Sequence, residues 1–168
     1  MDERYPIGTF QLEGDITKAL TNQWIDEIAN LPKKVRDAVS GLSEEQLDTP
    51  YREGGWNIRQ VVHHIADSHM NAYIRFKLAL TEESPTIKPY EEARWAELED
   101  SKLPVEVSLT LLESVHVRLV TLLNSLNDDE LKRTFVHPAS GIVSIEKNIG
   151  MYAWHGNHHL AHITNAKL

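Results

Sequence analysis

The sequence predicts an all-α protein, a single four-helix bundle that spans residues 1–168. Apolar residues recur every three or four positions through four long segments, which places them on one face of a helix in each segment. No stretch of comparable length alternates between apolar and polar residues, so strands are not expected. A chain of 168 residues, 41% of them apolar, is long enough to bury one core between such helices.

Residues 15–30 form the first predicted helix, because four apolar residues recur there at intervals of four: Ile16, Leu20, Trp24 and Ile28. Pro32 suits the first turn of a continuing or a new helix, and Gly41 suits its end. Directly afterwards, Ser43 and Gln46 have the spacing of a capping box, in which both side chains accept hydrogen bonds from free amides at the start of a helix.

The longest predicted helix runs from residue 58 to about Thr81. Before it, "TPYREGGWN" (49–57) is predicted to be a loop because of its proline and paired glycines, and Asn57 can cap the helix that follows. After it, residues 82–104 contain three prolines. We therefore expect a long connection there, with one short helix around "EEARWAEL".

Two further helices complete the predicted bundle, one over residues 105–126 and one that begins near Ser144 or Ile145. A loop containing "HPASG" separates them. The segments "LSEEQL" from Leu42 and "LNDDEL" from Leu126 resemble each other, and each lies between a long helix and a loop that leads to a histidine-bearing helix. Either the capping sequences converged, or two equivalent helix pairs bring their histidines to one end of the bundle.

Composition excludes several classes of function. The net charge of −8 argues against a nucleic-acid surface, which needs a basic patch or stripe. No basic run or long apolar run suits a membrane partner. The absence of cysteine excludes disulfides, thiolate ligands and a cysteine nucleophile. The N-terminal "MDERYPIGTF" lacks the basic and apolar regions of an export signal, so we expect a cytoplasmic protein.

Seven of the nine histidines lie in two short segments, "HHIADSH" (63–69) and "HGNHHLAH" (155–162). On the last predicted helix, His155 and His159 lie at the edge of the apolar face, four residues apart, which is the spacing that two imidazoles need to bind one ion. His162 points further out, where it either supports a ligand ring from behind or packs in the core, and His158 is expected to face solvent.

The first histidine segment gives a less definite prediction. His64 begins a polar stripe on its helix that continues through Ser68, Asn71 and Arg75. Such a stripe can border a polar cavity, with Asn71 and Arg75 as substrate-binding residues, or it can be a solvated face. His69 falls within the apolar stripe, so periodicity leaves open whether it is a core or a functional residue, and His63 is expected on the solvent side.

Three neutral imidazoles around one ion leave a positive charge and an open ligand position, the pattern of a catalytic rather than a structural metal. Zinc is the first candidate, and nickel, copper or iron are alternatives. The motif is not "HExxH", because position 156 is glycine. Asp67 is the nearest candidate for a base or for a hydrogen-bond partner of a ligand ring, or it is simply an exposed acid. A thiol depends less on a base than water does, which favours group transfer.

Three stretches resemble the YfiT-like branch of the DinB-like superfamily: "YPIG", "LDTPYREGGWNIRQVVHHIADSHMNAYIRFKLALTEE" and "YAWHGNHHLAHI". The resemblance implies a four-helix bundle of up-down-down-up topology, a homodimer, and one divalent metal per subunit. The family's ligands correspond to the second histidine of "VVHH", His64, and to the first and last of "HGNHH", His155 and His159.

Members of this branch are labelled metal-dependent hydrolases, and related proteins are regarded as bacillithiol S-transferases. The resemblance therefore implies a metal-dependent enzyme whose partners are small molecules: a thiol such as bacillithiol, as co-substrate, and an electrophile. The alternatives are hydrolysis by metal-bound hydroxide and a non-catalytic metal- or ligand-binding bundle. Arg52 and Tyr51, in the loop before the His64 helix, are further candidates for binding carboxylates of the thiol.

Overall fold

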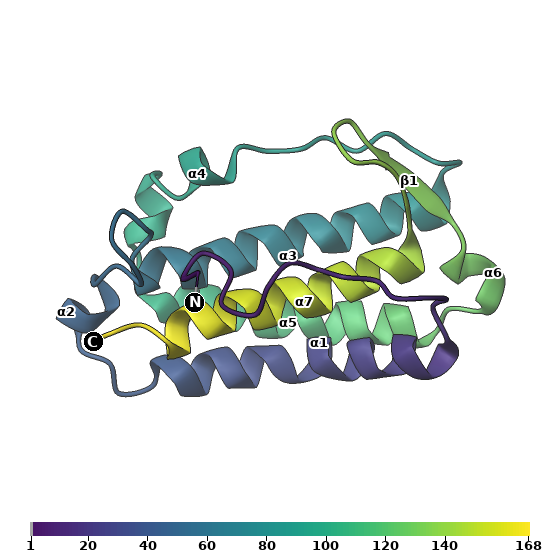
Figure 1. The fold of residues 1–168 in the computed structure, drawn as a ribbon. Coiled ribbons are helices and arrows are strands. Elements are labelled where there is room, and N and C mark those ends of the chain that lie inside the picture. The colour runs from purple at the N-terminus through teal and green to yellow at the C-terminus, as the bar shows by residue number, and fades with distance from the viewer. Residues whose placement is uncertain (1) are drawn as a thin grey trace.

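The computed structural model describes residues 2–168 and confirms the predicted four-helix bundle (Figure 1). Its long helices are α1 (Lys18–Val39), α3 (Ile58–Thr81), α5 (Val105–Asn124) and α7 (Ile145–Thr164). Helices α1 and α3 each pack against both α5 and α7. In Figure 1, α1 and α7 run in one direction and α3 and α5 in the other, which is the up-down-down-up order. Among the described residues, no helix has the length and apolar character needed to cross a membrane.

A crossover connection, residues 82–104, makes the parallel pair α3 and α5 possible. It returns the chain along the outside of the bundle (Figure 1) and contains α4 (Glu92–Trp95) and the 3-10 helix η1 (Glu99–Lys102). A connection of this length is needed because two parallel helices begin at the same end of the bundle. The connection therefore lies across the α3 side and can form a wall over the residues beneath it.

One hairpin departs from the expectation that strands are absent. Strand β1 (Thr134–His137) pairs antiparallel with β2 (Gly141–Ser144) over four residue pairs. Each strand has only four residues, too few for alternation to stand out in the sequence. Gly141 adopts a positive φ of 80°, a conformation that glycine reaches without strain. The backbone of Val136 also bonds to Pro85 and Ile87, which attaches the hairpin to the crossover connection.

The predicted helix starts are confirmed by their caps. Asn57 and Gln60 form a capping box before α3, as do Ser43 and Gln46 before the short α2 (Glu44–Leu47). The second copy of the repeated segment forms the equivalent helix α6 (Asp128–Leu131), capped by Asn127. The repeated sequence therefore encodes the same capped turn in both places.

Pro32 lies inside α1 rather than in a first turn, because the helix continues without a break from Lys18 to Val39. A proline has no N–H, so the carbonyl four residues earlier, that of Ile28, lacks its usual helical donor. The buried ring of His116, on α5, fills this role: its Nδ1 lies 2.7 Å from the Ile28 oxygen.

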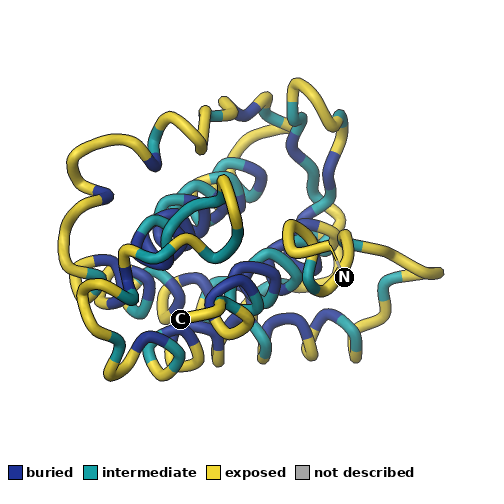
Figure 2. Tube along the Cα trace, turned by 60° about the vertical axis from the view of Figure 1, so that its left-hand side comes forward, coloured by how far each residue is buried: buried dark blue, intermediate teal, exposed yellow. Residues whose placement is uncertain are grey.

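The core lies between the four helices, and buried positions follow their inward sides (Figure 2). Helices α1 and α7 approach closely because α7 carries glycines where they meet. A Cβ at Gly150 would lie 2.8 Å from the Trp24 ring, and one at Gly156 would overlap the Leu31 methyl groups. Position 156 is therefore glycine for a packing reason, and a larger residue such as glutamate has no room there.

Candidate metal centre

Three histidines from two helices converge on one point. His64 on α3 and His155 and His159 on α7 each offer a ring nitrogen, and these nitrogens lie within 4.8 Å of one another. The Nε2 atoms of His64 and His155 are 3.3 Å apart. The ring of His159 lies edge-on to both others, with centroid distances of 4.6 Å to His64 and 4.5 Å to His155.

Burial keeps these three rings neutral. It lowers the pKa of His64 to about 4 and the pKa values of His155 and His159 well below the ordinary 6.5, and the neighbouring histidines lower them further. Within the described chain, no carboxylate is among the causes of these shifts. Three neutral imidazoles with converging lone pairs fit a borderline divalent cation such as zinc or nickel.

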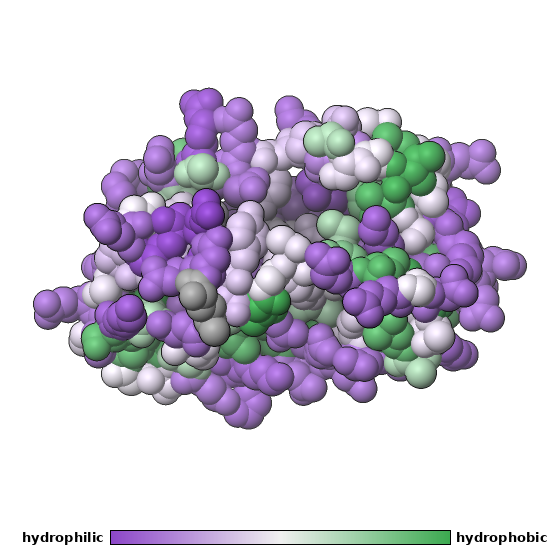
Figure 3. All heavy atoms as spheres, viewed as in Figure 1, coloured by the Kyte–Doolittle hydropathy of each residue, from purple (hydrophilic) through white to green (hydrophobic). Residues whose placement is uncertain are grey.

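A cavity of about 510 Å³ opens beside the three histidines. Its aromatic walls are Trp56, Tyr90, Tyr152 and Trp154, and its polar groups include Ser68, Arg75 and Glu92. The Ser68 hydroxyl lies 3.5 Å from Nε2 of His155. The molecular surface is hollowed below the crossover connection, which carries Tyr90 and Glu92 (Figure 3).

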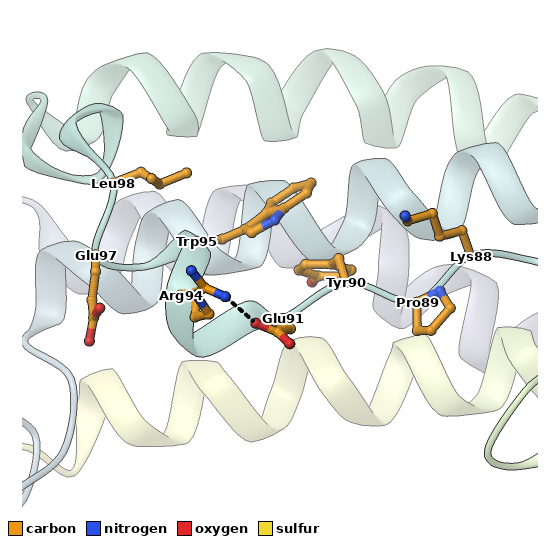
Figure 4. Close-up of a pocket in the computed structure, with 8 residues that line it drawn as sticks. All are labelled: Lys88, Pro89, Tyr90, Glu91, Arg94, Trp95, Glu97 and Leu98. Carbon is orange, nitrogen blue, oxygen red and sulfur yellow. Dashed lines mark hydrogen bonds and ion pairs between the residues drawn. The ribbon is translucent and has the colours of Figure 1, made fainter.

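A larger hollow of about 960 Å³ lies along the crossover connection and shares Pro89 and Tyr90 with the histidine cavity. Figure 4 shows the Tyr90 and Trp95 rings side by side in it, with Arg94 paired to Glu91. None of its eight lining residues in the described structure is a histidine. The smaller cavity is therefore the one that a metal-bound substrate would occupy.

The polar stripe on α3 divides between two environments. Ser68 and Arg75 line the cavity, and Nη2 of Arg75 donates to the Lys88 carbonyl at 3.3 Å. Asp67 and Asn71 are not among the described residues that line it. The Asn71 amide donates to the Asp67 carbonyl, while burial and the charge of Asp100 raise the pKa of Asp67 to about 6.

Tyr51, Arg52 and His162 lie behind His159, away from the cavity lining. The Tyr51 ring stacks on His162 at a centroid distance of 4.1 Å, and Nε of Arg52 donates to the Tyr51 hydroxyl. The Nδ1 atoms of His159 and His162 are 3.2 Å apart, and Nε2 of His162 donates to the Arg4 carbonyl at 3.1 Å.

A second group of three histidines, His158, His159 and His162, also clusters within 4.8 Å. The two hydrogen bonds of His162 account for the nitrogens of that ring and for Nδ1 of His159. Nδ1 of His158 has no hydrogen-bond partner among the described residues, so only His159 and His162 form a hydrogen-bonded pair in this group.

Two histidines expected at the surface are buried, so those two predictions are wrong. His158 is 7% exposed because Trp154 stacks on it at 4.6 Å and Tyr5 of the N-terminal segment lies next to it. His63 is 4% exposed, with Ser108 at 2.6 Å and the Leu103 carbonyl at 2.8 Å from its ring nitrogens. A helical wheel marks both as outward-facing because it ignores chain segments that cover a helix from outside.

Three residues that line the cavity were not predicted from the sequence: Trp56, Tyr90 and Glu92. Tyr90 and Glu92 come from the crossover connection, and Trp56 comes from the loop before α3. Neither segment has a periodic pattern that would mark these three residues, and only the packing of the two segments beside α7 brings them to the cavity.

Comparison with known proteins identifies the family. Residues 22–163 match the sequence profile of the DinB superfamily. The chain belongs to the DinB superfamily. A relative from Oceanobacillus iheyensis, named "Putative metal-dependent hydrolase", is 60% identical over 165 residues, which cover 98% of this chain and 96% of the relative. A protein of the same name from Bacillus mycoides is 58% identical over 166 residues, covering 99% and 96%.

Two solved structures confirm the fold, and the first of them also confirms the predicted resemblance. YfiT from Bacillus subtilis, described as "a probable metal-dependent hydrolase with an unusual four-helix bundle topology", is 49% identical and superposes with a TM-score of 0.94 over 98% of this chain and 95% of its own. A second four-helix bundle protein, 20% identical, superposes with a TM-score of 0.60 over 83% of this chain and 94% of its own, and it supports the fold alone.

Proposed function

We propose that this protein is a metal-dependent enzyme in which His64, His155 and His159 hold one divalent cation, with zinc as the first candidate and nickel as the second. The observation that carries this proposal is the convergence of three neutral ring nitrogens at the wall of a cavity. When bound there, the ion would supply Lewis acidity and lower the pKa of a water molecule or a thiol.

The chain's own residues hold the ligand rings and shape the cavity. Trp56 packs against His64 at a centroid distance of 4.7 Å and stacks near His159 at 6.4 Å. His162 donates to the Arg4 carbonyl through Nε2, so its Nδ1 accepts from Nδ1–H of His159. This leaves Nε2 of His159 with the free lone pair, and His162 acts as a positioning residue behind that ligand.

For the reaction, we propose transfer of a small thiol, bacillithiol in the first instance, to an electrophile. The sulfur forms a bond to the electrophilic carbon and the thiol proton passes to solvent. The bond from that carbon to its leaving group, or to the oxygen of an epoxide ring, breaks and its electron pair goes to the departing atom. This reaction suits a site where the nearest sequence-predicted base, Asp67, lies outside the cavity lining. Arg75 on the cavity wall can bind a carboxylate of either reactant.

Hydrolysis is the second candidate, and Glu92 favours it. This exposed carboxylate of α4 lines the cavity and could accept a proton from water. The names of the two relatives point the same way.

One assay separates the candidates. Protein stripped by a chelator and reloaded with zinc or nickel is incubated with an aryl halide or epoxide, with and without bacillithiol, and separately with ester and amide substrates. Conjugation that requires both metal and thiol supports transfer, and thiol-independent turnover of an ester or amide supports hydrolysis. Stoichiometric metal binding without turnover of any substrate would contradict both and favour a binding module.

We further propose that the protein forms a homodimer. Three apolar residues on one side of α5 are exposed in the single chain: Val107, Leu111 and Val117. Light scattering of the protein as it elutes from a size-exclusion column should give twice the mass of the 19.2 kDa chain. A monomer at micromolar concentration would contradict the proposal.

A further inference from the structure

A chain of hydrogen bonds runs from the metal-ligand set through the core of the bundle. Nδ1 of His155 lies 3.0 Å from Nε2 of His69, and Nδ1 of His69 lies 2.7 Å from Nε2 of His116. Nδ1 of His116 then lies 2.7 Å from the backbone oxygen of Ile28. The four residues belong to α7, α3, α5 and α1, so the chain of bonds crosses every long helix.

The last acceptor fixes the direction of every bond in this chain. A carbonyl oxygen only accepts, so His116 must carry its proton on Nδ1 and present a lone pair on Nε2. The rings of His69 and His116 are buried, at 0% and 2% exposure, and their hydrogen-bond partners are imidazoles and a carbonyl rather than carboxylates, so each ring is neutral and has one N–H. His69 therefore donates from Nδ1 to His116 and accepts at Nε2 from His155.

The consequence reaches the metal site. With its proton on Nδ1, His155 has its lone pair on Nε2, the nitrogen that lies 3.3 Å from Nε2 of His64. The opposite tautomer would place a hydrogen on the nitrogen that a cation needs. His69 and His116 are 0% and 2% exposed, so water cannot replace either partner.

The starting point of the chain of bonds is a feature of α1. The Ile28 carbonyl lacks its helical donor because Pro32 stands four residues later. An unpaired buried carbonyl is costly, and the His116 N–H is the donor that satisfies it. Pro32 thus leaves the Ile28 carbonyl as a free acceptor inside the bundle. The bond to this carbonyl determines which ring nitrogen of His116 carries the proton, and through it the protonated nitrogens of His69 and His155.

We propose that His69 and His116 are positioning residues that hold His155 in the tautomer with its Nε2 lone pair directed into the metal site, and that the Ile28 carbonyl left free by Pro32 sets this order. The proposal rests on the proposed role of His155 as a ligand. It adds two residues to the site that touch neither the cavity nor the cation, and it gives His69 a function beyond packing.

The first test reads the tautomers directly in the metal-free, full-length protein. Long-range ¹H–¹⁵N spectra of the imidazole rings distinguish a protonated from a bare ring nitrogen, and single histidine variants assign the signals. We expect His116, His69 and His155 each to carry the proton on Nδ1. A proton on Nε2 of His155 or His69 would overturn the proposal, whatever the activity.

The second test measures metal affinity by competition with a chromophoric chelator. His116→Phe keeps a ring of similar size but removes the acceptor for His69, so we expect roughly 10- to 100-fold weaker zinc binding. His116→Gln restores an acceptor and should recover most of the affinity. A folded His116→Phe protein with wild-type affinity and an unchanged His155 tautomer would refute the positioning role.

The two proposals fail differently. The expected tautomers together with no metal binding would remove the enzyme proposal and leave the order of protons intact. Tight metal binding with Nε2–H on His155 in the metal-free protein would remove the positioning role and leave the metal site intact. If His116→Phe does not fold, the spectra of the wild-type protein still test the proposed tautomers of His116, His69 and His155.

Discussion

Acidification should destabilise the metal-free protein because its buried histidines bind protons more readily in the unfolded chain. Burial lowers the pKa of His64 and His116 from 6.5 to about 4, and the rings are 7% and 2% exposed. Below about pH 6.5 the unfolded chain binds a proton on each ring and the folded protein does not. Folding must then release those protons, so the free energy of unfolding falls as pH falls.

The magnitude follows from the size of the pKa shifts. A change from 6.5 to about 4 corresponds to about 3 kcal/mol for each ring, lost progressively between these two pH values. His69, His155 and His159 are shifted in the same direction and add to the loss. Because a domain of this size is stable by only about 5–15 kcal/mol, we expect cooperative unfolding near pH 5.

Urea unfolding at a series of pH values, followed by circular dichroism with a chelator present, measures this loss. His116→Gln removes one of the rings and should reduce the loss between pH 7 and pH 5 by about 2 kcal/mol. A free energy of unfolding that stays constant from pH 7 to pH 4.5 would refute the reasoning, because it would mean that the buried rings accept protons in the folded state.

Three further predictions concern the site and its packing. His159→Ala should no longer bind stoichiometric zinc in elemental analysis. The control His137→Ala, which changes a cavity residue outside the ligand set, should retain the zinc. Full zinc content in His159→Ala would exclude His159 as a ligand. Gly156→Ala should lower stability by about 1–3 kcal/mol in urea unfolding, because the new methyl group overlaps Leu31; an equal cost in a Leu31→Ala background would show that this contact is not the cause. Arg75→Met should raise KM for a carboxylate-bearing substrate about tenfold with little change in kcat, while the control Arg94→Met on α4 should not; equal effects in both would indicate a general charge effect.

The helices and the three-histidine group could be predicted because both depend on local spacing. Apolar periodicity and caps such as Asn57 define helix positions within a few residues. The i,i+4 spacing of His155 and His159 places both rings on one side of α7 whatever the other helices do. The resemblance to the superfamily then supplied His64, which periodicity alone only permitted.

The rest of the site depends on contacts between distant segments. His158 and His63 are buried by the N-terminal segment and by the end of the crossover connection, and a wheel of one helix contains neither. His116 stands alone among the apolar residues of α5, and nothing in its neighbourhood connects it with His69 or Pro32. Those relationships exist only once four helices are packed in one order.

The topology also makes the three-histidine group depend on the packing of α3 against α7. His64 on α3 and His155 on α7 are 91 residues apart in the chain, so their rings meet only when these two helices pack together. Closing so long a loop has an entropic cost, so a chain in which α3 and α7 have not packed together would bind a cation poorly. A cation that binds only the finished bundle stabilises it by mass action, and in the cell the supply of metal would then help set how long each copy of the protein survives.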